Sequence, residues 1–163
     1  MGKIVRADKF YNREEVAKDT KSLYIFTDNT DRDSGKGEIP EESWYSKKYG
    51  SGKHYPKVTS ALIRGLDNAY PITTQRWYNK EHKGLFGRWK DHDLEEFRRV
   101  INDDFDEIIK NMGNYDRIVF PMGGIFNSKI ADISKNRVPA LHEFLFNKCL
   151  ELKEIYETSK RNE

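Results

Sequence analysis

The sequence predicts a single α/β domain in which a mixed, partly parallel sheet is flanked by helices in a three-layer arrangement. Residues 22–27 and 117–121 are short apolar runs rich in β-branched and aromatic side chains, as in strands buried on both faces. Residues 93–112 and 138–156 repeat apolar side chains at helical spacing. Because these elements alternate after a strand expected at 69–73, the sheet is expected to be at least partly parallel.

Local end signals support the two long helices. Acidic residues crowd the start of the first, where the helix dipole favours them, and Gly113 stands where a C-cap is expected. Pro139 suits the first turn of the second. The shorter elements are expected, in chain order, as an edge strand at 3–7, a helix at 13–18, a helix at 41–49 after Pro40, and strands at 61–64 and 69–73 on either side of a turn.

Length and composition fit one domain that spans residues 1–163. A chain of 163 residues is long enough to bury one hydrophobic core. The single Cys149 cannot form an intrachain disulfide, which fits a reducing compartment, and its helical segment favours a buried structural thiol. The N-terminus is too polar for a signal peptide, and no apolar run approaches the roughly 18 residues of a membrane span. We therefore expect a cytoplasmic protein without a membrane partner.

The charge is unevenly distributed along the chain. Residues 44–90 carry ten Lys or Arg against two acidic residues, whereas residues 91–116 carry nine acidic residues against three basic ones. Lys and Arg interleaved with aromatic side chains can hold single-stranded nucleic acid, so nucleic acid is an open alternative partner for 44–90. Aromatic residues at this density are more often core, and no nucleic-acid recognition motif accompanies them.

The polar loop at 28–37, directly after a buried strand, is the strongest ligand-binding candidate. Its glycines and lysine can offer backbone N–H groups and a cation to a phosphate. The loop lacks the spacing of a P-loop, and a calcium site at Asp31-x-Asp33 is not favoured. The histidines and the lone cysteine lack zinc-ligand spacing, so neither metal nor cofactor is expected. The alternative is a solvated loop whose side chains bond to their own backbone. The candidates in it are Asp28, Asn29, Arg32, Gly35, Lys36 and Gly37.

A second glycine-bearing loop follows the strand at 117–121. In open α/β sheets the ligand crevice lies beyond the carboxyl ends of the strands, so the two loops are expected to meet at one edge. Its candidates are Gly123, Gly124, Asn127, Ser128 and Lys129. Further ligand-binding candidates between the loops are Arg64, Asn68, Thr73, Thr74 and Arg76, the arginines as clamps for phosphate or carboxylate. Candidate catalytic carboxylates are Asp28, Asp91 and Asp93, although helix capping also accounts for the last two.

Taken in order, these landmarks resemble an uncharacterised family of small proteins found in bacteria and their phages. That family's pattern runs from Phe-Gly-Asp-Asn through Arg-Gly-x-x-Asn-Ala and Ile-Pro-Thr-Lys to Gly-Ile-Gly-Thr-Gly-Leu-Ala. The resemblance covers about residues 5–145, with an insertion-like segment near 40–59. The matching residues are Phe26-Thr27-Asp28-Asn29 with Arg32 and Gly35-Lys36-Gly37, Arg64-Gly65-Leu66-Asp67-Asn68-Ala69, Ile72-Thr73-Thr74-Gln75-Arg76, Asp91-His92-Asp93 and Val119-Phe120-Pro121-Met122-Gly123-Gly124-Ile125.

The same arrangement distantly resembles a macrodomain. That resemblance implies an ADP-ribose-type ligand, with Asp28 or Asn29 on the base or ribose side and Gly123-Gly124 near the phosphates. The sequence departs from the family pattern at Thr27, at Thr74 or Gln75, and in the late loop, where repeated glycines are missing.

Three functions follow as hypotheses. The favoured one is a binding module for a small anionic nucleotide or ADP-ribose-type ligand, which in a phage could sequester a host immune signalling nucleotide in the host cytoplasm. The second is a hydrolase acting on the same ligand class through one of the candidate carboxylates. The third is a nucleic-acid- or host-protein-binding factor that uses the segment 44–90. The oligomeric state is left open, and a homo-oligomer is compatible with the sequence.

Overall fold

A computed structural model describes residues 2–76, 87–128 and 130–162 of the chain. Its framework is a four-stranded sheet in the order β1-β6-β2-β5, and every neighbouring pair of strands in it is parallel. The α/β class is therefore confirmed, and β1 is an edge strand as predicted. The strands are β1 (Lys3–Arg6), β2 (Ser22–Asn29), β5 (Ala69–Gln75) and β6 (Arg117–Phe120).

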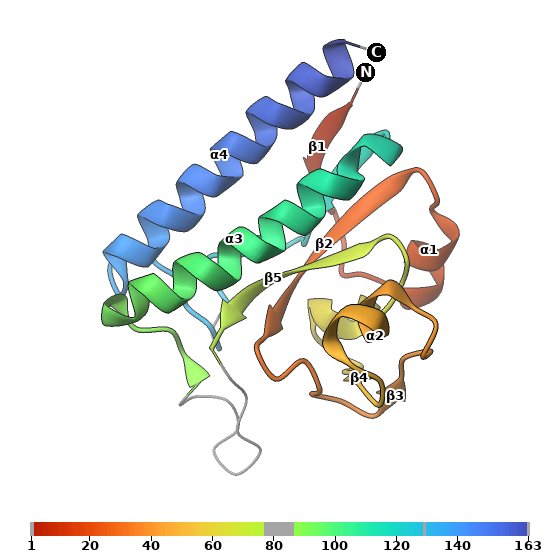
Figure 1. The fold of residues 1–163 in the computed structure, drawn as a ribbon, viewed down its shortest axis with the longest axis horizontal. Coiled ribbons are helices and arrows are strands. Elements are labelled where there is room, and N and C mark those ends of the chain that lie inside the picture. The colour runs from red at the N-terminus through yellow and green to blue at the C-terminus, as the bar shows by residue number, and fades with distance from the viewer. Residues whose placement is uncertain (1, 77–86, 129, 163) are drawn as a thin grey trace.

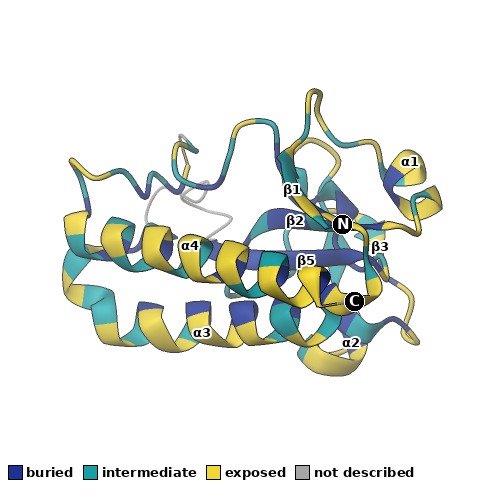
Figure 2. Cartoon of the chain, turned by 90° about the horizontal axis from the view of Figure 1, so that it is seen from above, coloured by how far each residue is buried: buried dark blue, intermediate teal, exposed yellow. Residues whose placement is uncertain are grey.

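Two long helices lie side by side over one face of this sheet (Figures 1 and 2). They are α3 (Leu94–Asn111) and α4 (Pro139–Arg161). Their apolar stripes pack with Leu23 and Ile25 of β2, which have no exposed surface. Five more residues than predicted are helical at the end of α4, because Tyr156 and Lys160 there remain buried and bond to backbone oxygens of Tyr115 and Gly113.

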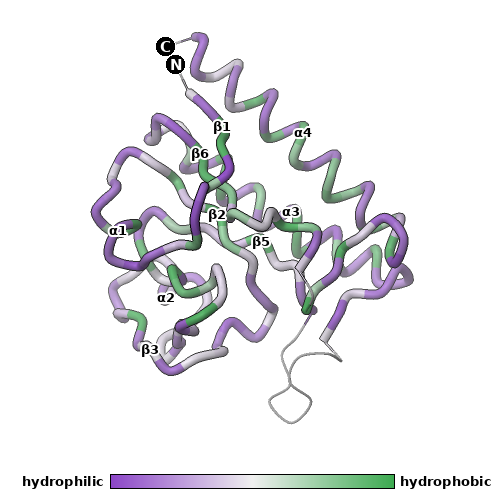
Figure 3. Tube along the Cα trace, turned by 180° about the vertical axis from the view of Figure 1, so that it is seen from behind, coloured by the Kyte–Doolittle hydropathy of each residue, from purple (hydrophilic) through white to green (hydrophobic). Residues whose placement is uncertain are grey.

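The other face of the sheet is covered by short elements rather than by long helices. Phe26 of β2 packs there with Val16, Tyr45 and Ile63 in a second apolar cluster. Figure 3 shows that the hydrophobic residues gather in the sheet, with β1, β6 and β2 largely green and the outer loops mostly purple. The short elements are α1 (Arg13–Lys18), β3 (Gly37–Glu38), α2 (Trp44–Tyr49), β4 (His54–Tyr55) and the 3-10 helix η1 (Ser60–Ile63). Of these, α2 lies next to α3, because Lys48 forms ion pairs with Asp103 and Glu107 of that helix (Figure 2).

The strand predicted at 61–64 is wrong, since residues 60–63 form η1. The Arg64 N–H donates to the Ala61 carbonyl at 2.9 Å, which closes a tight helical turn. A four-residue apolar run does not distinguish a strand from a buried turn, so the sequence alone favoured the wrong one. The helix predicted at 41–49 begins only at Trp44, because the Ser43 hydroxyl caps it by accepting from the N–H of Ser46.

The polar end of β2 belongs to the strand itself. Residues Asp28 and Asn29 continue the parallel ladder with β5, opposite Thr73 and Gln75, and the register shifts between them. This shift brings an irregular, polar strand end to the carboxyl edge of the sheet. Among the described residues, no helix is long and apolar enough to cross a membrane.

Candidate functional site

A cleft of about 920 Å³ opens at the carboxyl ends of β2 and β5. Four segments that are distant in the sequence form its walls, which brings the loop at 28–37 together with part of the loop after β6, as the strand order predicted. The lining residues are Thr27, Asp28, Asn29, Ser34, Gly35, Lys36, Pro56, Lys57, Val58, Thr59, Ala61, Arg64, Thr74, Gln75, Ser128, Ile130 and Ala131.

The inner end of the cleft is built on a buried ion pair between Asp28 and Arg64. Neither side chain has any exposed surface, and two guanidinium nitrogens of Arg64 donate to the two carboxylate oxygens. Tyr45 donates its hydroxyl to Asp28 Oδ2 at 2.7 Å, and the Asn29 N–H donates to Oδ1 at 2.9 Å. Burial raises the pKa of Tyr45, so this hydroxyl remains a donor. Burying a carboxylate and a guanidinium costs free energy, and these hydrogen bonds offset part of that cost.

Arg64 also fixes the loop at 28–37 in space. Its Nη1 donates to the carbonyl oxygen of Ser34 at 3.0 Å and to that of His54 in β4. Arg13 of α1 donates to the carbonyl oxygen of Arg64 at 2.7 Å. One side chain thus joins the end of β2, the loop and the β3–β4 strand pair, and Arg13 of α1 holds the backbone of Arg64.

Arg32 lies inside the protein rather than in the cleft. It has a left-handed backbone with φ of 56°, and its N–H donates to Asn29 Oδ1 at 2.8 Å. Its guanidinium stacks over the Tyr49 ring at 3.9 Å and donates to Thr73 Oγ1 at 3.1 Å. The same group lies 3.5 Å from Asp28 Oδ2. The side chains of Asn29 and Arg32 therefore shape the loop from within.

Asp104 of α3 is a buried carboxylate that the sequence reasoning missed. Its side chain has no exposed surface, Oδ2 accepts from the Thr73 N–H at 2.7 Å, and Oδ1 lies 3.7 Å from Arg32 Nη2 without a hydrogen-bond partner. Burial raises its pKa to about 7, although Arg32 and Thr73 act in the opposite direction. The available signal was an acidic residue between Ile101, Phe105 and Ile108 on the apolar side of the helix.

The charged groups that face the cleft are two lysines. Lys36 and Lys57 are both exposed and line it, and neither forms an ion pair within the part of the chain that the structure describes. Gly35 lines the cleft too, but a Cβ there or at Gly37 would collide with Tyr55. These two glycines are therefore explained by packing against β4.

Several predicted site residues lie away from the cleft. Asn68 is at the amino ends of the strands, where its amide donates to the carbonyl oxygens of Val16, Asp19 and Ser22. Arg76 pairs with Glu96 of α3 at 3.3 Å.

The remaining predicted residues between the two loops divide between core and cleft. Thr73 is buried against Asp104 and Arg32, while Thr74 lines the cleft. Asp91 accepts from the backbone N–H groups of Ala140 and Leu141 and so caps α4, and Asp93 accepts from the Lys90 N–H.

The loop after β6 reaches the cleft only with its later residues. Ser128 lines the cleft, whereas Gly123, Gly124 and Asn127 line an adjoining cavity of about 220 Å³, which Ser128 also borders. Lys129 lies outside the described residues. The two predicted loops thus meet, with the glycine pair set to one side.

The aromatic residues of the segment 44–90 pack inward where the structure describes them. Trp44 stacks on Tyr70 with ring centroids 4.7 Å apart, and Trp89 has no exposed surface. Trp77, Tyr78 and Phe86 lie outside the described residues. Cys149 is half-buried in α4, and burial raises its pKa to about 12, which keeps it a thiol.

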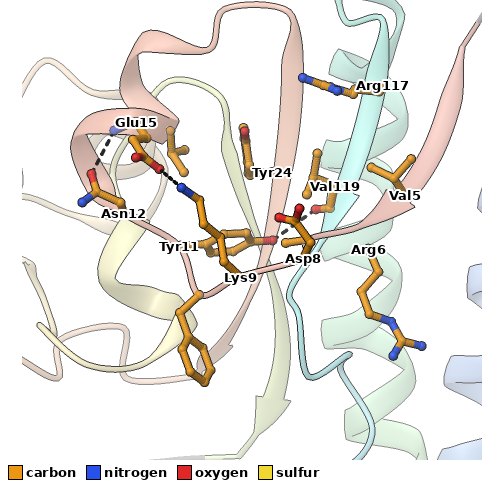
Figure 4. A pocket seen from close by; sticks show the side chains of 13 residues that line it. Val5, Arg6, Asp8, Lys9, Tyr11, Asn12, Glu15, Tyr24, Arg117 and Val119 are labelled. Carbon is orange, nitrogen blue, oxygen red and sulfur yellow. Dashed lines mark hydrogen bonds and ion pairs between the residues drawn. The ribbon is translucent and has the colours of Figure 1, made fainter.

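A further hollow of about 380 Å³ lies between β1, β6 and α1 (Figure 4). Lys9 and Glu15 pair across it at 2.9 Å, and the Tyr11 hydroxyl below them donates to the Ile25 carbonyl oxygen at 2.7 Å. These three groups are engaged with one another or with the backbone, and the other charged residues of the lining, Arg6, Asp8 and Arg117, are of both signs. Within the described ranges, no three His, Cys, Asp or Glu side chains gather as a metal site requires.

Comparison with known proteins gives a family but no activity. The model of a family of unknown function, DUF7831, matches residues 6–148. No curated protein and no solved structure matches the chain.

Replacing Asp28 with Ala is expected to lower the free energy of unfolding by about 3–5 kcal/mol, because it leaves the buried Arg64 without its counter-ion. Denaturant unfolding measures this. Lys9→Ala is the matched control, since it breaks an exposed ion pair and is expected to change the free energy of unfolding far less than Asp28→Ala does. Equal losses in the two variants would contradict the importance of the buried pair.

Asp104 is expected to make stability depend on pH. Its pKa is raised from 3.8 to about 7 in the folded protein. The stability that the protonated Asp104 contributes is therefore fully present below the unfolded pKa of 3.8 and is lost as the pH rises to the folded pKa of about 7. Between about pH 5 and pH 7 the wild type should lose on the order of 2 kcal/mol relative to Asp104→Asn. Parallel pH profiles for the two proteins would rule this out.

Proposed function

We propose that this chain, which belongs to the DUF7831 family of unknown function, binds a small anionic ligand of nucleotide or ADP-ribose type in the cleft beyond β2 and β5. The observation that carries the proposal is the pair of lysines, Lys36 and Lys57, on two different segments of the cleft wall. A cleft of this size is in the range that holds small-molecule ligands in other proteins.

The balance of charge in the cleft favours an anion. Asp28 and Arg64 neutralise each other at its inner end, and Asp28 is the one carboxylate among the described residues that line the cleft. Lys36 and Lys57 therefore leave a net positive charge toward the ligand, with ammonium groups that can approach phosphate oxygens.

The neutral part of the lining suits a sugar and a ring. Hydroxyl groups of Ser34, Thr59, Thr74 and Ser128 can bond to ribose or phosphate oxygens. Val58 and Ile130, which are 89% and 40% exposed, add apolar surface at the same cleft. A ligand with both an anionic and an apolar part uses both kinds of lining.

Binding without turnover is the form of the proposal that the candidate carboxylates favour. Asp28 is enclosed by donors, and Asp91 and Asp93 accept backbone N–H groups at helix starts. A general base needs to reach water or substrate in a productive position, which these contacts oppose. A protein that returns its ligand unchanged acts by sequestering or sensing it.

Isothermal titration against ADP-ribose, NAD and AMP tests the proposal. At least one of these ligands is expected to bind, and Lys36→Ala with Lys57→Ala should weaken it by at least about tenfold, because each lysine contributes an ion pair with a phosphate. Mass analysis after incubation should recover the ligand unchanged.

The matched control is the double variant Lys110→Ala with Lys153→Ala. These exposed lysines lie on α3 and α4, so the change in net charge is the same but the cleft is intact. Flat titrations with all three ligands, or equal weakening in both double variants, would remove the proposal. Conversion of the ligand would replace binding with hydrolysis.

A further inference from the structure

We propose that the cleft continues into a second, uncharged subsite, and that the ligand therefore has two parts, an anionic group and an uncharged ring. The second subsite is the adjoining cavity of about 220 Å³. This inference rests on the proposed function and specifies which kind of anionic ligand the chain binds.

The two cavities share a wall. Val58, Thr59 and Ser128 line both the cleft and the smaller cavity. A ligand that extends past these three residues occupies both spaces. The geometry therefore fits an extended molecule better than a compact anion such as inorganic phosphate.

The two cavities differ in charge. The cleft is lined by Lys36, Lys57 and the Asp28–Arg64 pair, whereas none of the described residues that line the smaller cavity is charged. A charged group would lose hydration there without gaining an ion pair, while an uncharged ring would not. The lining of the smaller cavity is Phe10, Tyr11, Val58, Thr59, Ser60, Leu62, Pro121, Met122, Gly123, Gly124, Asn127 and Ser128.

An aromatic face and an amide are available at the smaller cavity. Phe10 is 79% exposed, although its neighbour Tyr11 is held by hydrogen bonds to the carbonyl oxygens of Ile25 and Val119. The side chain of Asn127 has no hydrogen-bond partner among the described residues. An exposed ring can stack on a planar ligand, and an amide offers a donor and an acceptor to the edge of a base.

The backbone leaves room at the same place. A Cβ built at Gly123 has no heavy atom within 4 Å, and Gly124 has φ of 74° with its N–H bonded to the Pro121 carbonyl oxygen. Gly123 and Gly124 therefore add no side chain to their part of the cavity wall. We assign the ring to this side and the anionic group to Lys36 and Lys57, which is the reverse of the orientation that a macrodomain resemblance implies.

Titration with two probes, ADP-ribose and ribose 5-phosphate, tests this assignment. The second probe lacks the adenine ring, and its affinity is obtained by competition against ADP-ribose. Phe10→Ala should weaken ADP-ribose roughly tenfold, since stacking on an aromatic side chain contributes about 1–3 kcal/mol, and should leave ribose 5-phosphate unchanged within about twofold. Gly123→Leu, which adds bulk to the cavity wall, should do the same.

Two control variants separate the subsite from general effects. Phe146→Ala removes an aromatic ring on α4 that is 47% exposed. Gly113→Leu adds a side chain at another glycine where a Cβ would have no heavy atom within 4 Å. Both should bind the probes as the wild type does, and unchanged thermal midpoints should accompany all four variants.

The outcomes distinguish this inference from the proposed function. If Lys36→Ala with Lys57→Ala weakens ADP-ribose but Phe10→Ala and Gly123→Leu do not, the second subsite is wrong and the anionic cleft stands. Equal weakening of both probes by Phe10→Ala also overturns the subsite. If neither probe binds the wild type, both proposals fail together.

Discussion

The buried ion pair between Asp28 and Arg64 is the interaction on which the candidate site depends. A carboxylate and a guanidinium without exposed surface are stable inside a protein only when nearly all of their hydrogen bonds are made. Here Tyr45, Arg32 and the backbone of Asn29 complete the shell around Asp28. The pair connects the central strand β2 to the loop and to the β3–β4 strand pair, so the cleft has a defined shape before any ligand arrives.

This arrangement separates structural charge from binding charge. The most strongly held groups, Asp28, Arg32 and Arg64, bond to one another and to other groups inside the protein. The less constrained Lys36 and Lys57 line the open part of the cleft. Asp104 extends the buried network to α3, so the helix layer and the loop are joined through Arg32 and Thr73. A ligand that reaches Lys36 and Lys57 therefore faces the neutral, hydrogen-bonded Asp28–Arg64 pair at the inner end of the cleft.

The parts of the fold that depend on periodic apolar patterns were predictable from the sequence. The apolar runs of β2 and β6 and the apolar stripes of α3 and α4 have to be buried, which fixes the core. Parallel strands bring their carboxyl ends to one edge of the sheet, which fixes the place of the cleft. The direction of individual polar side chains was not predictable. Nothing in the sequence distinguishes Arg64 from Asn68 as candidate ligand-binding residues. In the structure Arg64 forms a buried ion pair with Asp28, whereas Asn68 donates hydrogen bonds to backbone oxygens at the opposite end of the sheet. Asp104 was hidden among acidic neighbours because its burial depends on how α3 lies on β5.

An NMR titration of ¹⁵N-labelled protein with ADP-ribose tests the central claim most directly. The account predicts shifts of the backbone amides at Ser34, Lys36, Thr59, Thr74 and Ser128, while the Nε–H resonance of Arg64 stays in place because its pair with Asp28 is preformed. Shifts confined to other surfaces, or a large displacement of the Arg64 resonance, would contradict a preformed cleft at the carboxyl ends of β2 and β5.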